Sequence, residues 1–150
     1  MRIAIAFDHR GVRLREAVFA TVAEAHEPVD LGVDNASVRA DYPDQAIEVG
    51  NAIRSGQAER AVLVCGSGVG ASIVANRIAG VRAAICHDGY SARQGVEHDD
   101  MNVLCLGADA LGPELASDLV RTFLAAEFDG EERHAARLRQ LEMLEQRPRD

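Results

Sequence analysis

The segment AVLVCGSGVGASIVANR, residues 61–77, places a cysteine and a serine among alternating glycines at the end of an apolar run. Glycines at this spacing let the backbone turn tightly and direct several N–H groups at one spot, which stabilises an anion. The same N–H groups and the start of the following helix would stabilise the thiolate of Cys65, which could then act as a base. The hydroxyl of Ser67 can pass a proton between neighbouring oxygens. The motif therefore predicts proton transfer beside a bound anion.

Two plainer interpretations of this segment are open on its residues alone. Gly66, Gly68 and Gly70 could serve only to let a strand and a helix pack closely, and a free cysteine is more often a small buried hydrophobe. We expect that second role for Cys86 and Cys105, which lie in apolar runs. The spacing is GxGxG, not the GxGxxG of dinucleotide sites, and no acidic residue about 20 positions later could hold a ribose. A nucleotide-binding module is therefore the least expected function.

Other polar residues are expected to approach Cys65 from neighbouring strand ends. Asp8 and His9, in DHRG, follow the first apolar run and would lie at the same sheet edge as Cys65. His98, in VEHDDMN, is expected at the mouth of the fifth strand, so that three polar clusters converge on one edge. The ordinary alternative for each histidine is a surface position without chemistry.

The C-terminal segment carries a candidate phosphate-binding group. Arg133 and Arg137 are four residues apart on one face of an expected helix, with His134 adjacent. Two guanidinium groups at this spacing suit a phosphate, whereas such a pattern taken alone is usually a solvated helix face.

Apolar runs alternate with helical periodicities along the chain, which predicts the elements that position these residues. Strands are expected at residues 2–7, 28–32, 61–65, 81–87 and 102–107. Helices are expected within residues 14–25, 44–56, 71–80, 89–100, 113–128 and 131–146. Short apolar strands that alternate with helices imply a parallel sheet covered on both faces. We expect an α/β fold, a Rossmann-like three-layer α/β/α sandwich with a five-stranded parallel sheet, as a single domain over residues 1–150.

Composition excludes several classes of protein. All 16 basic residues are arginine, so a Schiff-base or P-loop lysine is absent, and the net charge of -8 argues against a nucleic-acid partner. The three cysteines are expected to be reduced, and the scattered histidines show no metal-binding spacing. Apolar runs stay far below the roughly 18 residues of a membrane span, and the N-terminus lacks an export signal. We expect a cytoplasmic protein with no metal, no cofactor and no membrane partner.

The motifs DHRG, DYP, VLVCGSGVGASIVANR, GVRAAIC, YSA, EHDDMNVLCLG and ERHAARL occur in this order between residue 2 and about residue 145. Together they resemble the type B ribose-5-phosphate isomerases, which share a family with galactose-6-phosphate isomerase subunits. The resemblance implies a metal-free aldose–ketose isomerase of sugar phosphates. It also implies a homodimer or a dimer of dimers with active sites shared between subunits, in which the C-terminal helix, about residues 131–146, packs on the partner.

The resemblance also assigns roles to individual residues. Cys65 would move a proton between C1 and C2 of the opened sugar, Ser67 would transfer protons at O1 and O2, and His98 would help to open the furanose ring. The backbone of the glycine loop would hold the enediolate. The implied substrate-binding residues are Asp8, His9, Tyr42, Gly66, Gly68, Val69, Gly70, Asp99, Arg133, His134 and Arg137.

This chain departs from the family pattern at two positions. Asp109 stands where the family commonly has a phosphate-binding arginine, and Asp99 stands where it has asparagine. If Asp109 pointed into the pocket it would repel a phosphate, and Arg10 could restore the positive charge from another direction. The expected reaction is the interconversion of ribose 5-phosphate and ribulose 5-phosphate through a cis-enediolate. The alternatives are a diverged paralogue that isomerises a tetrose or hexose phosphate, and a catalytically weak sensor or partner subunit.

Overall fold

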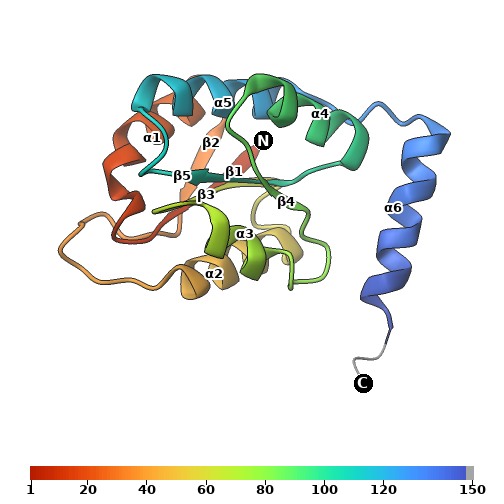
Figure 1. Ribbon diagram of the computed structural model, residues 1–150, viewed down its shortest axis with the longest axis horizontal. Helices are drawn as coiled ribbons and strands as arrows, with labels where there is room; N and C mark the ends of the chain where they lie inside the picture. Colours follow the sequence, from red (N-terminus) through yellow and green to blue (C-terminus); the bar gives the residue numbers. More distant parts are fainter. Residues whose placement is uncertain (148–150) are drawn as a thin grey trace.

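The computed structural model describes residues 1–147 and has a five-stranded parallel sheet at its centre (Figure 1). The strands are β1 (Arg2–Phe7), β2 (Glu27–Asp30), β3 (Arg60–Cys65), β4 (Ala83–Ile85) and β5 (Val103–Gly107). Their order across the sheet is β2-β1-β3-β5-β4, and every neighbouring pair is parallel. The expected five-stranded parallel sheet is therefore confirmed.

Helices cover both faces of the sheet. They are α1 (Arg15–Ala23), α2 (Tyr42–Arg54), α3 (Val69–Ala75), α4 (Gly89–Asp99), α5 (Pro113–Ala125) and α6 (Glu132–Glu145), with a 3₁₀ turn, η1, at Gly11–Leu14. In Figure 1, α1, α4 and α5 lie above the sheet and α2 and α3 lie below it. This arrangement is the expected three-layer α/β/α sandwich.

Alternating side chains of the central strands supply two separate cores. Ile5 and Phe7 of β1 pack into the core under α1, α4 and α5, while Ala4 and Ala6 face α2 and α3. Both groups are fully buried, as expected for parallel strands that are covered on two sides. Cys65 at the end of β3 belongs to the α2/α3 side.

The strand register places three loops side by side at one edge of the sheet. Phe7 pairs with Val64, and Cys65 pairs with Gly107, so β1, β3 and β5 end together. The loops that follow are joined by backbone hydrogen bonds. Asp8 N donates to Val64 O at 3.1 Å, and Asp109 N donates to Gly66 O at 2.8 Å. This carboxyl edge is where ligands bind in open parallel sheets.

Several element ends differ from the expected ones. The strand expected at residues 81–87 is reduced to Ala83–Ile85, and the helix expected at 71–80 is α3, Val69–Ala75. The side chain of Asn76 ends α3 because it donates to Ser72 O at 3.1 Å and to Ala83 O at 2.8 Å. The chain then turns at Gly80, which has a φ of 82°.

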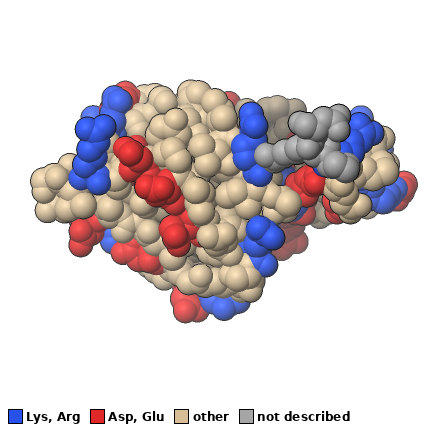
Figure 2. Space-filling view, turned by 90° about the horizontal axis from the view of Figure 1, so that it is seen from below, with Lys and Arg blue, Asp and Glu red and all other residues tan. Residues whose placement is uncertain are grey.

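The C-terminal helix α6 stands apart from the sandwich in Figure 1. It agrees with the helix expected at residues 131–146, but its packing on a partner subunit stays a prediction. Leu141, Met143 and Leu144 on this helix are 38%, 57% and 56% exposed. None of the helices in residues 1–147 combines the length and apolar character of a membrane span. On the face seen in Figure 2, acidic and basic side chains lie in small interspersed groups.

Candidate active site

A cavity of about 290 Å³ lies at the carboxyl edge of the sheet. Its lining comes from the loops after β1 and β3 and from the start of α2. The lining residues are Asp8, His9, Arg10, Ala40, Asp41, Tyr42, Cys65, Gly66, Ser67 and Gly70. The cavity therefore brings together most of the candidates expected from the first and third strand ends.

The glycine loop wraps its backbone around the Cys65 thiol. Gly68 N donates to Cys65 Sγ at 3.1 Å, and Val69 N donates to Ser67 Oγ at 3.2 Å. Gly68 has a φ of 81°, a backbone conformation that residues with a side chain rarely adopt. A Cβ on Gly70 would lie 2.6 Å from Cζ of Tyr42, so this glycine allows the tyrosine to pack against the loop.

Backbone donors of the loop are free to bind a ligand. Within residues 1–147, the N–H groups of Gly66, Ser67 and Gly70 donate to no protein acceptor. Unpaired N–H groups in a tight turn favour a negative charge, because each one can donate a hydrogen bond to it. The loop can therefore stabilise an oxyanion next to Cys65.

Asp8 and His9 are each fixed by a backbone contact. Asp8 is 4% exposed, and its Oδ1 accepts from Arg10 N at 2.9 Å and from Gly11 N at 2.8 Å. Nδ1 of His9 lies 2.8 Å from Ala40 O. Because a carbonyl can only accept, Nδ1 carries the hydrogen and Nε2 of His9 is the free ring nitrogen.

Burial makes the thiols of the other two cysteines unreactive. Cys86 is 1% exposed and Cys105 is fully buried. Burial raises the pKa of Cys86 to about 11, and it also raises the pKa of Cys105. Of the three thiols, Cys65 is the one that lines the cavity.

Asp109 does not line this cavity. Its carboxylate forms ion pairs with Arg10 and with Arg13, the second at 3.0 Å. It borders a different cavity, with Arg13, Ala108 and Leu111 among the lining residues. The repulsion that Asp109 would cause inside the pocket is therefore avoided, because two arginines hold it outside.

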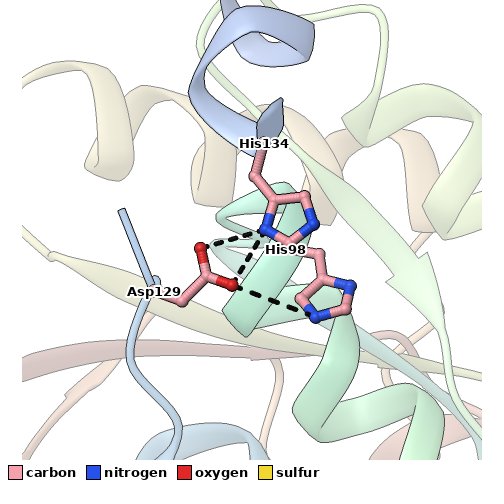
Figure 3. A group of neighbouring side chains, drawn as sticks. All are labelled: His98, Asp129 and His134. Atoms are coloured by element: carbon pink, nitrogen blue, oxygen red, sulfur yellow. Dashed lines mark hydrogen bonds and ion pairs between the residues drawn. The ribbon is translucent and has the colours of Figure 1, made fainter. Parts of the chain in front are cut away.

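His98 does not lie at the mouth of β5 near Cys65, so its expected placement is wrong. It belongs to the last turn of α4, which leads into the amino end of β5. In a parallel sheet the amino and carboxyl ends of the strands lie at opposite ends of the sheet, so His98 and Cys65 are separated by about the length of a strand. His98 instead contacts Asp129 and His134 (Figure 3).

The group of His98, Asp129 and His134 joins three segments. His134 Nδ1 donates to Asp129 Oδ2 at 2.8 Å, and His98 Nε2 lies 4.0 Å from the same oxygen atom. The hydrogen bond from His134 lowers the pKa of Asp129. Asp129 is not among the residues expected from the sequence. The feature that could have indicated it is its position five residues before His134, just before α6.

The same three side chains offer a possible set of metal ligands. Their donor atoms lie within 4.8 Å of one another. However, the imidazole rings are stacked at 23°, so their in-plane lone pairs run nearly parallel instead of converging on one point. The hydrogen bond between His134 and Asp129 would also have to break. The geometry favours a hydrogen-bonded cluster over a metal centre.

The remaining candidates lie with this second group, away from the cavity of Cys65. Arg133 and Arg137 are exposed on α6, and Arg133 Nε contacts Glu131 at 2.8 Å. Asp99 lies at the end of α4, where its Oδ2 is 3.5 Å from Gln94 Nε2. One chain therefore carries two separated sets of candidate residues.

Comparisons with known proteins show the family to which the chain belongs. A family model described as Ribose/Galactose Isomerase matches residues 3–141. A relative from Escherichia coli (strain K12), ribose-5-phosphate isomerase B, is 40% identical over 147 residues, which cover 97% of each chain. D-erythrulose-4-phosphate isomerase of Pectobacterium atrosepticum is 37% identical, over 87% of this chain and 86% of the relative.

A solved structure has the same fold. The type B ribose 5-phosphate isomerase of Trypanosoma brucei superposes with a TM-score of 0.92 at 40% identity, covering 95% of this chain and 97% of that one. The five-stranded parallel sheet covered by helices, together with these relatives, defines an α/β enzyme. More particularly, the chain belongs to the ribose/galactose isomerase family. The resemblance expected from the motifs, and the expectation of an aldose–ketose isomerase, are confirmed.

Proposed function

We propose that this enzyme interconverts ribose 5-phosphate and ribulose 5-phosphate in the cytoplasm, with Cys65 as the base. The observation that carries the proposal is the contact between the Cys65 thiol and the glycine loop, where Gly68 N donates to Sγ at 3.1 Å. The base and the oxyanion donors thus share one small cavity. The relative from Escherichia coli bears the name of this reaction.

The reaction needs one proton to move between two carbons. In the proposed mechanism the Cys65 thiolate takes the proton from C2 of the open-chain aldose, and the C2–H electron pair forms the enediolate. The free N–H groups of the glycine loop stabilise the developing oxyanion. Ser67 moves a proton between O1 and O2, and Cys65 then returns its proton to C1. Atoms and electrons balance without a redox partner.

Two copies of the chain are proposed to complete each site. The cavity around Cys65 holds the base and the oxyanion donors, whereas His98, Arg133, His134 and Arg137 lie at or beyond the other edge of the sheet. Residues so separated act on one small sugar only if they come from different copies. The exposed Leu141, Met143 and Leu144 of α6 provide apolar surface for such an assembly. We propose a homodimer, or a dimer of dimers, in which α6 reaches the partner.

A four-carbon sugar phosphate is the second candidate substrate. It is supported by the relative named D-erythrulose-4-phosphate isomerase, which matches this chain nearly as well as the ribose 5-phosphate enzyme does. The departures at Asp99 and Asp109 affect binding groups and leave Cys65 and Ser67 in place. A change of substrate with retained proton transfer would follow this pattern.

Proton NMR in heavy water tests the reaction and the substrate together. Solvent deuterium entering C1 or C2 would be followed with aldose and ketose phosphates of four, five and six carbons. Fastest exchange with ribose 5-phosphate supports the proposal, and fastest exchange with the four-carbon sugar supports the second candidate. Absence of exchange with every sugar contradicts both and favours a sensor or partner subunit.

The role of Cys65 is tested by matched variants. Cys65→Ala should lower kcat by about 100- to 10,000-fold with little change in substrate affinity, as expected for the loss of a general base. Cys86→Ala is the control, since Cys86 is buried and lies outside the cavity. Equal turnover of the Cys65→Ala variant and the wild type would refute the assignment.

A further inference from the structure

Arg10 and Asp109 form an ion pair beside the candidate active site. They are far apart in the sequence and are brought together because the loops after β1 and β5 flank the loop after β3. Arg10 lines the cavity of Cys65, while Asp109 does not. The pair therefore presents its cation, and not its anion, to a ligand.

The backbone fixes both partners over the glycine loop. A Cβ placed on Gly66 would lie 2.8 Å from Nε and 2.9 Å from Cζ of Arg10, and 3.0 Å from Oδ2 of Asp109. Asp109 N donates to Gly66 O at 2.8 Å, and Arg10 N donates to Asp8 Oδ1 at 2.9 Å. The guanidinium thus lies directly against Gly66, beside the loop N–H groups that are free to bind an anion.

Arg10, Arg13 and Asp109 together carry a net positive charge. One carboxylate oxygen accepts from Arg10 and the other accepts from Arg13 at 3.0 Å, so two cations share one anion. The Arg10 side chain is 61% exposed, which leaves guanidinium donors available to a ligand. Among residues 1–147, Arg10 is the one arginine that lines the cavity. A guanidinium can bind a phosphate through two parallel N–H groups.

We propose that Arg10 binds the phosphate monoester of the substrate, and that Asp109 holds the Arg10 guanidinium over the glycine loop. Arg10 is then a specificity-determining residue for anionic sugars. This inference rests on the proposed function, since it assigns the anionic end of the substrate to one side of the cavity. It also explains how the chain accommodates an acidic residue at position 109.

Calorimetric titration with inorganic phosphate tests the binding role without turnover. Arg10→Ala should weaken phosphate binding by about 10- to 100-fold, the range expected for a lost charged hydrogen bond. Arg13→Ala is the matched control, because Arg13 pairs with the same carboxylate but borders another cavity. Its effect should stay below about threefold. Arg10→Gln preserves most of the side-chain volume and should weaken binding in the same way if Arg10→Ala folds poorly.

Enzyme kinetics separates failure of this inference from failure of the proposed function. Arg10→Ala should raise KM for ribose 5-phosphate with little effect on kcat. An unchanged phosphate affinity and an unchanged KM would overturn the role of Arg10 while leaving the isomerase intact. Equal losses in the Arg10→Ala and Arg13→Ala variants would also overturn it. Loss of phosphate binding only in the Arg10 variants, without isomerisation of any sugar by the wild type, would support the anion site and refute the proposed function.

Discussion

The imidazole rings of His98 and His134 stack with their centroids 4.1 Å apart. His98 lies in the last turn of α4, and His134 lies in the first turn of α6, so the stack joins the last helix to the sandwich. Asp129 completes the contact by accepting a hydrogen bond from His134, and its own N–H donates to Glu97 O at 3.0 Å. This cluster helps to orient α6, and with it Arg133 and Arg137, together with the hydrogen bond from Gly80 N to Glu145 at the other end of the helix, at 3.1 Å.

Removal of the Asp129 carboxylate should loosen α6. In Asp129→Ala, the His134 ring loses the acceptor of its Nδ1 proton, and His134 is only 2% exposed, so water does not easily replace it. We expect faster backbone hydrogen exchange in residues 132–145, with exchange in β1 and β3 unchanged, measured by mass spectrometry. Asp118→Ala on α5 is the control, since that carboxylate pairs with Arg121 on the surface. Equal exchange of α6 in the wild type and both variants would contradict this role.

The contribution of Asp129 should disappear in acid. Hydrogen bonding to His134 lowers the pKa of Asp129 below its ordinary value of 3.8 in the folded protein. A carboxyl group whose pKa is lowered in the folded state stabilises the fold at every pH above its ordinary pKa. This stabilisation is lost as the pH falls through the lowered pKa. The difference in unfolding free energy between the wild type and Asp129→Ala should be constant above about pH 5 and shrink below about pH 4. A difference that grows on acidification would have the wrong sign.

The three thiols should differ in reactivity. At pH 8 a thiol with a pKa of about 11, as for Cys86, is ionised in about one molecule per thousand. Cys105 is fully buried, whereas Cys65 lines the cavity. Iodoacetamide should therefore modify Cys65 at least about tenfold faster than the other two in the folded protein, as counted by peptide mass spectrometry. All three should react at similar rates in denaturant, and faster labelling of Cys86 in the native protein would refute the prediction.

Gly70→Ala should impair substrate binding and leave the fold intact. The added Cβ would lie 2.6 Å from Cζ of Tyr42, so the tyrosine ring that lines the cavity must shift. Alanine itself favours a helix by up to about 1 kcal/mol over glycine, which opposes unfolding. We expect kcat/KM to fall by about tenfold or more with little change in Tm. Gly89→Ala is the control, because its new Cβ meets no atom closer than 3.9 Å. Equal kinetics for the two variants would contradict the role of the Tyr42 contact.

Sequence patterns predicted the sheet and the glycine-loop site because both depend on local signals. The apolar run of residues 61–65 is continuous, as a strand covered on both faces requires, and Cys65 is its last residue. Residues that directly follow strand ends were placed at the correct edge. Asp8 and His9 are examples.

Errors arose where position depends on long-range geometry. His98 was assigned to the carboxyl edge because it precedes a strand closely in sequence, but a residue before a strand lies at that strand's amino end. The pairing of Arg10 with Asp109 depends on strand order and could not be read from either motif. Asp129 was missed because a single acidic residue in a polar turn carries no periodic signal. These contacts are set by tertiary packing.

The proposed site needs Cys65 and His98 from different copies, and mixed oligomers test this proposal most directly. Cys65→Ala and His98→Ala would be co-expressed with different affinity tags, and dimers that carry both tags would be isolated. In such a dimer one of the two sites combines an intact Cys65 with an intact His98, so turnover of ribose 5-phosphate should recover to about half of the wild-type value. Turnover no higher than that of the two parent variants would contradict a shared site.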